Sequence, residues 1–352
     1  MPIERLHLSR RRLLTGAAAC AGAAVGALPT AFGSEAGSAS GDAVATATDA
    51  ALPPAPTSES LAARLHQTLT PEQRRAICFP WDHRHPRFGL LRNRVGNNWN
   101  VTEPEIAGDF YTPDQRRLIR DIFEHLIEPD WHARFDRQLD DDTGGFCNDQ
   151  SIALLGEPGS GRFQFLLTGR HMTLRCDGDS AEHVAFGGPI FYGHDAGGFN
   201  EEAGHKGNVF WPQAIAANAV YGMLDGRQRD QALVPRLPRE SAIAFRRQGD
   251  QPPGLPVSGM SADQRAELER VLAVLLEPFR TRDRDEVRGC LSRQGGLDRC
   301  HLAFYREGDV GNDGIWDCWR LEGPSFVWYF RGAPHVHVWV NVADTPEIAT
   351  NA

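Results

Sequence analysis

The chain has 352 residues, of which 41% are hydrophobic, and a formal net charge of −9 at neutral pH. This length is ample for one large domain after a leader segment. The acidic balance argues against nucleic acid and against a stable association with anionic membranes, because both partners are themselves negatively charged.

The N-terminus has the pattern of an export signal. Residues 9–14, with the sequence SRRRLL, precede a weakly hydrophobic run of alanine and glycine from residue 17 to residue 28. Paired arginines before such a run are typical of a twin-arginine (Tat) signal, and the run is too short to span a bilayer. We therefore expect residues 1–31 to be a Tat signal peptide and the Tat translocase to be a partner during export. The mature protein would be periplasmic or extracellular, and this route often carries folded proteins that already hold a cofactor.

Residues 32–58 consist largely of Gly, Ser, Ala, Thr and Pro. Such a segment buries too little surface to offset its ordering entropy, so we expect a disordered low-complexity linker. The remainder, residues 59–352, is expected to be a single α+β domain. Its six cysteines include no CxxC pair, which argues against a thiolate zinc site. An oxidising compartment would permit a disulfide between Cys290 and Cys300.

Three helix starts share one local pattern. Thr70, Thr112 and Ser261 are each followed by Pro or Ala, an acid, and Gln-Arg. A hydroxyl N-cap with an acid in the first turn predicts a helix, and a Glu-Pro pair predicts the ends near Ile127 and Leu276 for the second and third. A further helix is predicted over residues 213–224. Shared capping chemistry accounts for the resemblance, with a weak internal repeat as the alternative.

Segments with the composition of strands fall into two blocks, separated by turn residues. They are 152–155, 163–168, 171–176 and 183–186, then 302–305, 316–321, 326–330 and 335–342. Short connections favour a mainly antiparallel sheet system, with helices packed before and between the two strand blocks, in an α+β fold. The glycine-rich stretch 187–210 is predicted to be a long functional loop.

The last strand carries the clearest chemical signal. Side chains alternate across a strand, so the valines at positions 336, 338, 340 and 342 share one face, and His335, His337, Trp339 and Asn341 share the other. Neighbours on one face stand about 6–7 Å apart, so both imidazoles can bind one cation. The alternative is a solvent-facing strand that the histidines only decorate, but an exposed face seldom carries an indole.

A third ligand must come from elsewhere, and His171 at the start of a predicted strand is the leading candidate. A histidine satisfied by a backbone carbonyl in the core is the alternative there. His194 and His205 come next, followed by Glu201 and Glu202. Three imidazoles with an open position suit copper or zinc, and one carboxylate among them suits iron or zinc.

Charged residues elsewhere supply candidate catalytic groups. Arg320 and Glu322 share a strand face and are either an ion pair or functional groups. In the functional reading, Glu322 is a general base or a partner of a liganding histidine. Arg320 and Arg175 would then bind an anionic substrate group, and Trp339 would contribute to substrate binding. The acidic run 140–142 is expected to be solvated.

Several of these segments together resemble an exported bacterial family known as domain of unknown function 3500. The resemblance lies in GRHMTL (169–174), GPIFYG (188–193), WRLEGP (319–324) and the final HVH (335–337). Members typically show Gly-His-His before the strand, whereas this chain has Arg170 in place of the first histidine. The resemblance implies no particular reaction and supports the choice of residues only.

The leading hypothesis is therefore an exported metal-dependent enzyme with His171, His335 and His337 as ligands of one transition-metal ion. Copper is favoured over zinc, which would make the protein a copper-dependent oxidoreductase acting on a small molecule. A zinc-dependent hydrolase and a non-catalytic periplasmic metal-binding protein are the alternatives. A module that binds its ligand on Trp328, Tyr329 and Trp339 would need no metal.

Overall fold

The structure, a computed structural model, describes residues 55–195, 208–247 and 249–348. The expected signal peptide and all but the last four residues of the expected linker lie outside this range. From residue 55 onward, the described residues belong to one compact unit. Its first helix, α1 (Ser58–Thr68), begins at the last residue assigned to the linker, where Thr57 caps it. In the described part of the chain, no helix is both long and apolar enough to cross a membrane.

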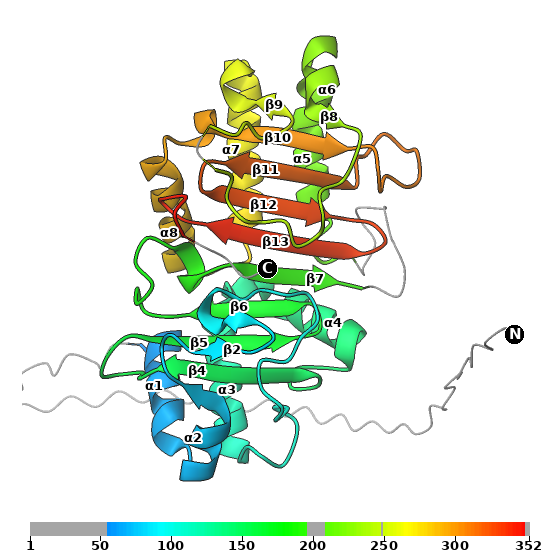
Figure 1. Ribbon diagram of the computed structural model, residues 1–352. Coiled ribbons are helices and arrows are strands. Elements are labelled where there is room, and N and C mark those ends of the chain that lie inside the picture. The colour runs from blue at the N-terminus through cyan, green and yellow to red at the C-terminus, as the bar shows by residue number, and fades with distance from the viewer. Residues whose placement is uncertain (1–54, 196–207, 248, 349–352) are drawn as a thin grey trace, which may run out of the picture. The chain divides into compact units, whose positions relative to one another are not determined.

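An 11-stranded mixed sheet, mostly antiparallel, organises the domain and confirms the α+β class (Figure 1). Its order is β1-β4-β5-β6-β7-β13-β12-β11-β10-β8, with β9 pairing β10 outside this path. The strands are β1 (Cys78–Phe79), β4 (Gln150–Gly156), β5 (Phe163–Gly169), β6 (Met172–Cys176), β7 (Ile190–His194), β8 (Leu233–Val234), β9 (Leu255–Pro256), β10 (His301–Tyr305), β11 (Cys318–Gly323), β12 (Phe326–Arg331) and β13 (Val336–Val342). A separate pair is formed by β2 (Arg84–His85) and β3 (Gly89–Leu90).

Apart from the short strands β2, β3 and β9, the described α-helices and strands occur in the same order twice. Four antiparallel strands, β4 to β7 and β10 to β13, form each half, and the halves meet where β7 pairs antiparallel with β13. The outer strands β1 and β8 each pair parallel with the first strand of their half. Within the described residues, four α-helices precede each block: α1, α2 (Pro71–Ile77), α3 (Pro113–Glu124) and α4 (His132–Thr143), then α5 (Pro212–Met223), α6 (Gly226–Ala232), α7 (Ala262–Leu276) and α8 (Thr281–Arg293). The element order thus favours the internal repeat over capping chemistry alone.

The three predicted helix starts are confirmed as capping boxes on α2, α3 and α7. In α2, the Thr70 hydroxyl accepts from the Gln73 N–H at 3.1 Å, and the Gln73 side chain accepts from the Thr70 N–H at 2.9 Å. The Gln73 amide also donates to the capping glutamine of α3, Gln115, at 2.8 Å. The two helix starts therefore stabilise each other. The end of α3 at Glu124 comes three residues before the expected Ile127.

Two assignments made from the sequence, one strand and one loop, are wrong. Residues 183–186 form no strand, and the last two of them belong to the short 3-10 turn Ala185–Gly187. The expected loop 187–210 contains β7, a central strand, while residues 196–207 of it lie outside the described range. Glycine is the reason for the second error. A Cβ at Gly193 would lie 2.4 Å from the Val336 carbonyl oxygen, so glycine here permits close strand pairing.

Helices cover one face of the sheet, and two irregular segments cross the other (Figure 1). One of these runs through residues 91–101, and the other, called the strap below, comprises residues 235–246. The valines of β13 face the helices in the main core, as predicted. Trp339 on the opposite face packs with Phe191, Tyr329 and Ile243 of the strap, so β13 is covered on both sides. Cys290 and Cys300 are both free, and the permitted disulfide between them is not formed.

Candidate metal centre

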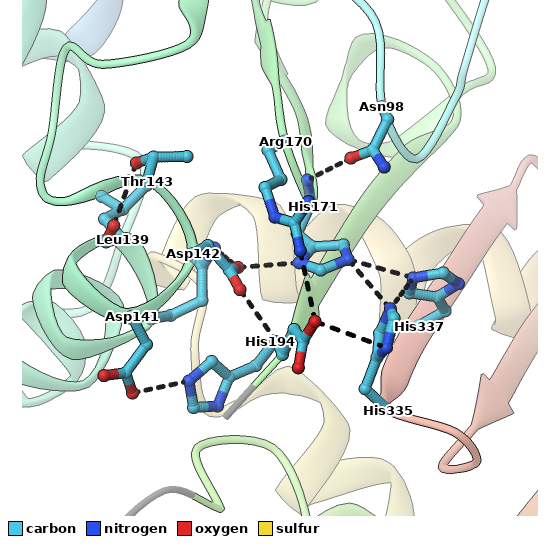
Figure 2. A network of polar contacts seen from close by, with 12 residues as sticks. Asn98, Leu139, Asp141, Asp142, Thr143, Arg170, His171, His194, His335 and His337 are labelled. Carbon is cyan, nitrogen blue, oxygen red and sulfur yellow. Dashed lines mark hydrogen bonds and ion pairs between the residues drawn. The ribbon is translucent and has the colours of Figure 1, made fainter. Parts of the chain in front are cut away.

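Three imidazoles from distant parts of the chain converge at one end of β13 (Figure 2). His335 directly precedes this strand, His337 lies within it, and His171 lies in the turn between β5 and β6. The Nε2 atoms of His171 and His335 are 3.2 Å apart, those of His335 and His337 2.9 Å, and those of His337 and His171 3.1 Å. All three rings therefore present the same atom to one point.

Strand register explains how His171 meets His337. On one side of β7, Met172 pairs with Tyr192, and on the other His337 pairs with Gly193. His171 therefore stands level with Gly193 and His337, on the same face of three adjacent strands. The outer two of these strands are about 10 Å apart. Because Gly193 has no side chain, the two rings can lean across it and meet.

The turn that carries His171 holds it in an unusual backbone conformation. Its φ of 53° is in the left-handed region, which a residue with a side chain seldom occupies. The His171 N–H donates to the Asn97 carbonyl at 2.9 Å and to the Asn98 side chain at 3.2 Å. These contacts with the 91–101 segment fix the peptide and direct the ring inward.

Each ring has a carboxylate near its second nitrogen. His171 Nδ1 lies 2.8 Å from Asp142 Oδ2, and His335 Nδ1 lies 3.8 Å from Asp195 Oδ2. His337 Nδ1 contacts the carboxylate of Glu240. A carboxylate at Nδ1 keeps the proton on that atom and leaves a lone pair on Nε2, which is the arrangement found behind metal-binding histidines.

Asp142 in the last turn of α4 is fully enclosed, with 0% of its side chain exposed. Burial raises its pKa, but the contacts with His171, the Gln138 amide at 2.7 Å and the Asp195 N–H at 2.9 Å lower the pKa below its usual value overall. The expectation of a solvated acidic run is wrong for this residue. Neighbouring Asp141 is more exposed and contacts His194 Nε2 at 3.0 Å.

Glu240 reaches the centre from the strap. Its local sequence contains no pattern that predicts a functional residue. Burial raises its pKa, whereas the stronger combined effect of His337 and Arg331 lowers it to about 2. Arg331 Nη1 lies 2.7 Å from Glu240 Oε2. The third carboxylate, Asp195, is similarly accompanied by Arg170 Nη2 at 3.2 Å. Two of the three carboxylates thus have an arginine neighbour.

Two of the rings, His335 and His337, are held in their neutral form. Burial, together with the nearby His337 and His171, lowers the pKa of His335 to about 4, and burial also lowers the pKa of His337. Three lone pairs about 3 Å apart repel one another, and a single proton can bridge only one pair. An ion about 2.0–2.1 Å from all three nitrogens would lie about 1 Å from their plane. Among the described residues, these three form the group suited to a metal ion.

The structure does not bring Arg320 and Glu322 to this centre. They lie on β11, two strands away from β13, and the residue of β11 level with His337 is Cys318. Arg320 Nε and Glu322 Oε2 form an ion pair at 3.0 Å, and Arg246 Nε lies 2.7 Å from Glu322 Oε1. The ion pair considered from the sequence is therefore present, but it is buried rather than solvated.

Arg175 and Trp339 occupy different settings. Arg175 is 2% exposed and donates to the carbonyl oxygens of Pro189 and Arg92 at 2.8 Å each, so its contacts are internal. Burial lowers its pKa to about 9. Trp339 lies one pleat from His337, edge-on to Phe191, and borders an open depression of about 360 Å³ that Glu240 also lines. Of the two, Trp339 is therefore the one near the centre.

The alternative ligands fall into two groups. His194 on β7 is buried, but its ring contacts Asp141 and does not join the three converging rings (Figure 2). His205, Glu201 and Glu202 lie outside the described residues.

A family model described as "Protein of unknown function (DUF3500)" matches residues 54–340. The chain therefore belongs to this family, as its motifs suggested. The match covers nearly all of the described residues and includes the three histidines. Comparisons with curated proteins and with solved structures returned no match.

Proposed function

We propose that this member of the DUF3500 family is an exported metal-dependent enzyme that holds one transition-metal ion through His171, His335 and His337. The observation that carries the proposal is the mutual approach of the three Nε2 atoms to within 3.2 Å. Imidazole nitrogens that present lone pairs to one point repel one another, and a cation between them would remove this repulsion.

The number and exposure of the ligands support catalysis over a purely structural role. Catalytic sites commonly supply three protein ligands and keep a further position open, whereas structural zinc sites supply four. His335 is the most exposed of the three side chains at 24%, against 12% for His337 and 1% for His171. A small molecule would therefore approach from the His335 side.

Copper is the metal we propose first. The group holds imidazole nitrogen alone, without thiolate, and imidazole suits copper and zinc. Bound copper would supply one-electron chemistry, which makes the protein an oxidoreductase acting on a small molecule. The chain's own contribution would be to hold three rings in one geometry through Asp142, Glu240 and Asp195.

Zinc is the second candidate, and one observation favours it. Carboxylates at the Nδ1 atoms of liganding histidines are a recurrent feature of zinc sites. Bound zinc would supply a water molecule of lowered pKa, which suits hydrolysis. A non-catalytic metal-binding protein would use the same ligands without turnover.

Elemental analysis of the protein purified from its own host tests these proposals. We expect about one metal ion per chain in the wild type and almost none in the double variant His335→Ala/His337→Ala. The control is His194→Gln, which changes a nearby buried histidine outside the converging group and should retain the ion. Equal metal content in the wild type and the double variant would refute the proposal. The element found decides between copper and zinc, and oxygen consumption or hydrolysis assays on the loaded protein distinguish an enzyme from a carrier.

A further inference from the structure

Arg320 and Glu322 form a buried ion pair that the proposed centre does not use. Their side chains are only 4% and 3% exposed. Burying charges at this depth is costly unless they are paired and hydrogen-bonded, and such a pair contributes little net stability. Their contacts give the first indication of a role, because both residues face the strap.

The sheet holds the strap by side chains from several strands. Arg320 Nη1 donates to the Ala242 carbonyl at 2.6 Å, and Asn341 Nδ2 donates to the Ile243 carbonyl at 2.9 Å. Glu322 binds Arg246 at the end of the strap. The strap itself contains neither helix nor strand, so these contacts stand in for a hydrogen-bonded ladder.

The strap is also the element that brings Glu240 to the imidazoles. Glu240 precedes Ala242 by two residues and contacts His337 Nδ1 and Arg331. An irregular segment positions a side chain accurately only where its backbone is anchored. The closest described anchor after Glu240 in the chain is the one that Arg320 makes to Ala242.

We propose that Arg320 and Glu322 are positioning residues that dock the strap and thereby hold Glu240 against His337. This inference rests on the proposed function, since the ring that Glu240 orients is taken to be a ligand. Docking of the strap and binding of the metal are then coupled, and the coupling is reciprocal. A docked strap raises metal affinity, and bound metal protects the strap.

The first measurement is the affinity for Co²⁺, whose binding is monitored through the visible absorption of the ion. It is made on wild type, Arg320→Met, Arg320→Lys and Glu322→Gln. We expect about a 10-fold loss for Arg320→Met and Glu322→Gln, because the outer partners of ligands contribute 10–100-fold to metal affinity. Arg320→Lys retains a donor and a charge, so it should recover part of the loss. Glu240→Ala should lower Co²⁺ affinity at least as much as Arg320→Met does.

A double-mutant cycle separates positioning from general destabilisation. If Arg320 acts through Glu240, Arg320→Met should lower Co²⁺ affinity little further in a protein that already carries Glu240→Ala. The control is Asp283→Asn on α8, which disrupts the ion pair of this buried carboxylate with the partly buried Arg280, at 3.0 Å. Whatever its effect on stability, that variant should leave Co²⁺ affinity within about twofold of wild type, because this ion pair involves neither the strap nor the three histidines.

Hydrogen exchange of the 235–246 peptide gives a readout that needs no metal. Arg320→Met should speed exchange of this peptide in the metal-free protein, and Co²⁺ should slow it in wild type. The positioning role would be overturned if the losses of Co²⁺ affinity in Arg320→Met and Glu240→Ala added up in the double variant. It would also be overturned if Arg320→Met left hydrogen exchange of the strap unchanged. Neither result would contradict the metal centre itself. Failure of the wild type to bind Co²⁺ would instead overturn the proposed function, and the coupling with it.

Discussion

His171 Nδ1 lies 2.8 Å from Asp142 Oδ2, and both side chains are almost completely enclosed, with 1% and 0% exposed. The two residues are 29 positions apart and come from a strand turn and the end of a helix. Because Asp142 also accepts from Gln138 and from the Asp195 N–H, its orientation is fixed from three sides. The carboxylate is therefore a rigid partner for the ring.

Replacing this carboxylate should weaken metal binding more than it weakens the fold. We expect Asp142→Asn to lower metal affinity by about 10–100-fold, because the neutral amide makes His171 a poorer ligand. Competition with a chromogenic chelator measures the change. Asp141→Asn, which alters the adjacent acid and its contact with His194, is the matched control and should stay near wild type. If both variants lost metal affinity to a similar extent, the negative charge of the region, and not the contact of Asp142 with His171, would set the affinity.

Gly193 should tolerate no side chain. An added Cβ would lie 2.4 Å from the Val336 carbonyl oxygen and 3.3 Å from the His337 ring. Gly193→Ala should therefore destabilise the protein by about 1–3 kcal/mol, as overpacking does, and also weaken metal binding. Urea unfolding and metal titration measure the two effects.

The control for this substitution is Gly222→Ala in α5, where a Cβ would meet nothing within 4 Å. Alanine is favoured over glycine inside helices, so this variant should be equally stable or more stable. If Gly193→Ala behaved in the same way, the close pairing of β7 with β13 would be refuted.

Stability should depend on pH through Glu286 on α8. Burial, together with Asp283, raises its pKa from 4.5 in the unfolded chain to about 8. The folded state therefore holds a proton that the unfolded state releases, and stability falls as pH rises between about 4.5 and 8.

Glu286→Gln removes this titration and keeps an oxygen to accept from the Phe186 N–H. We expect the variant to be more stable than wild type at pH 8–9, by on the order of 1–3 kcal/mol. Its stability should change less between pH 5 and pH 8. Unfolding curves at several pH values test this, and parallel pH profiles for the two proteins would contradict it.

Export can be tested on the N-terminal residues alone. Residues 1–58 fused to a folded fluorescent reporter should deliver it to the periplasm, since the Tat route accepts folded cargo. Changing Arg10 and Arg11 to lysine preserves the charge and should abolish delivery, whereas Arg5→Lys should not. Delivery that continues without the arginine pair would rule out a Tat signal.

Local patterns predicted much of the fold. The capping sequences at Thr70 and Thr112 specify helix starts because the hydroxyl and the glutamine bond to backbone groups within four residues. Alternating valines specify which face of β13 enters the core, since side chains alternate in any strand. The same alternation placed His335 and His337 on one face, so the pair could be singled out from the sequence.

Contacts between distant segments could not be predicted in this way. Asp142 looked like a solvated acid because its partner is 29 residues away, and Glu240 lies in an irregular segment without a pattern. Glycine misled in the region of Gly193, where it permits close pairing of strands and does not mark a loop.

The sequence by itself determined the element types, the faces of the last strand and the three histidines as candidates, because each depends on neighbours along the chain. Only the tertiary structure decided that the three rings meet, that carboxylates stand behind them, and that Arg320 and Glu322 hold the strap. The physical reason is register: His171 stands level with His337 only because β6, β7 and β13 pair as they do, with glycine between them.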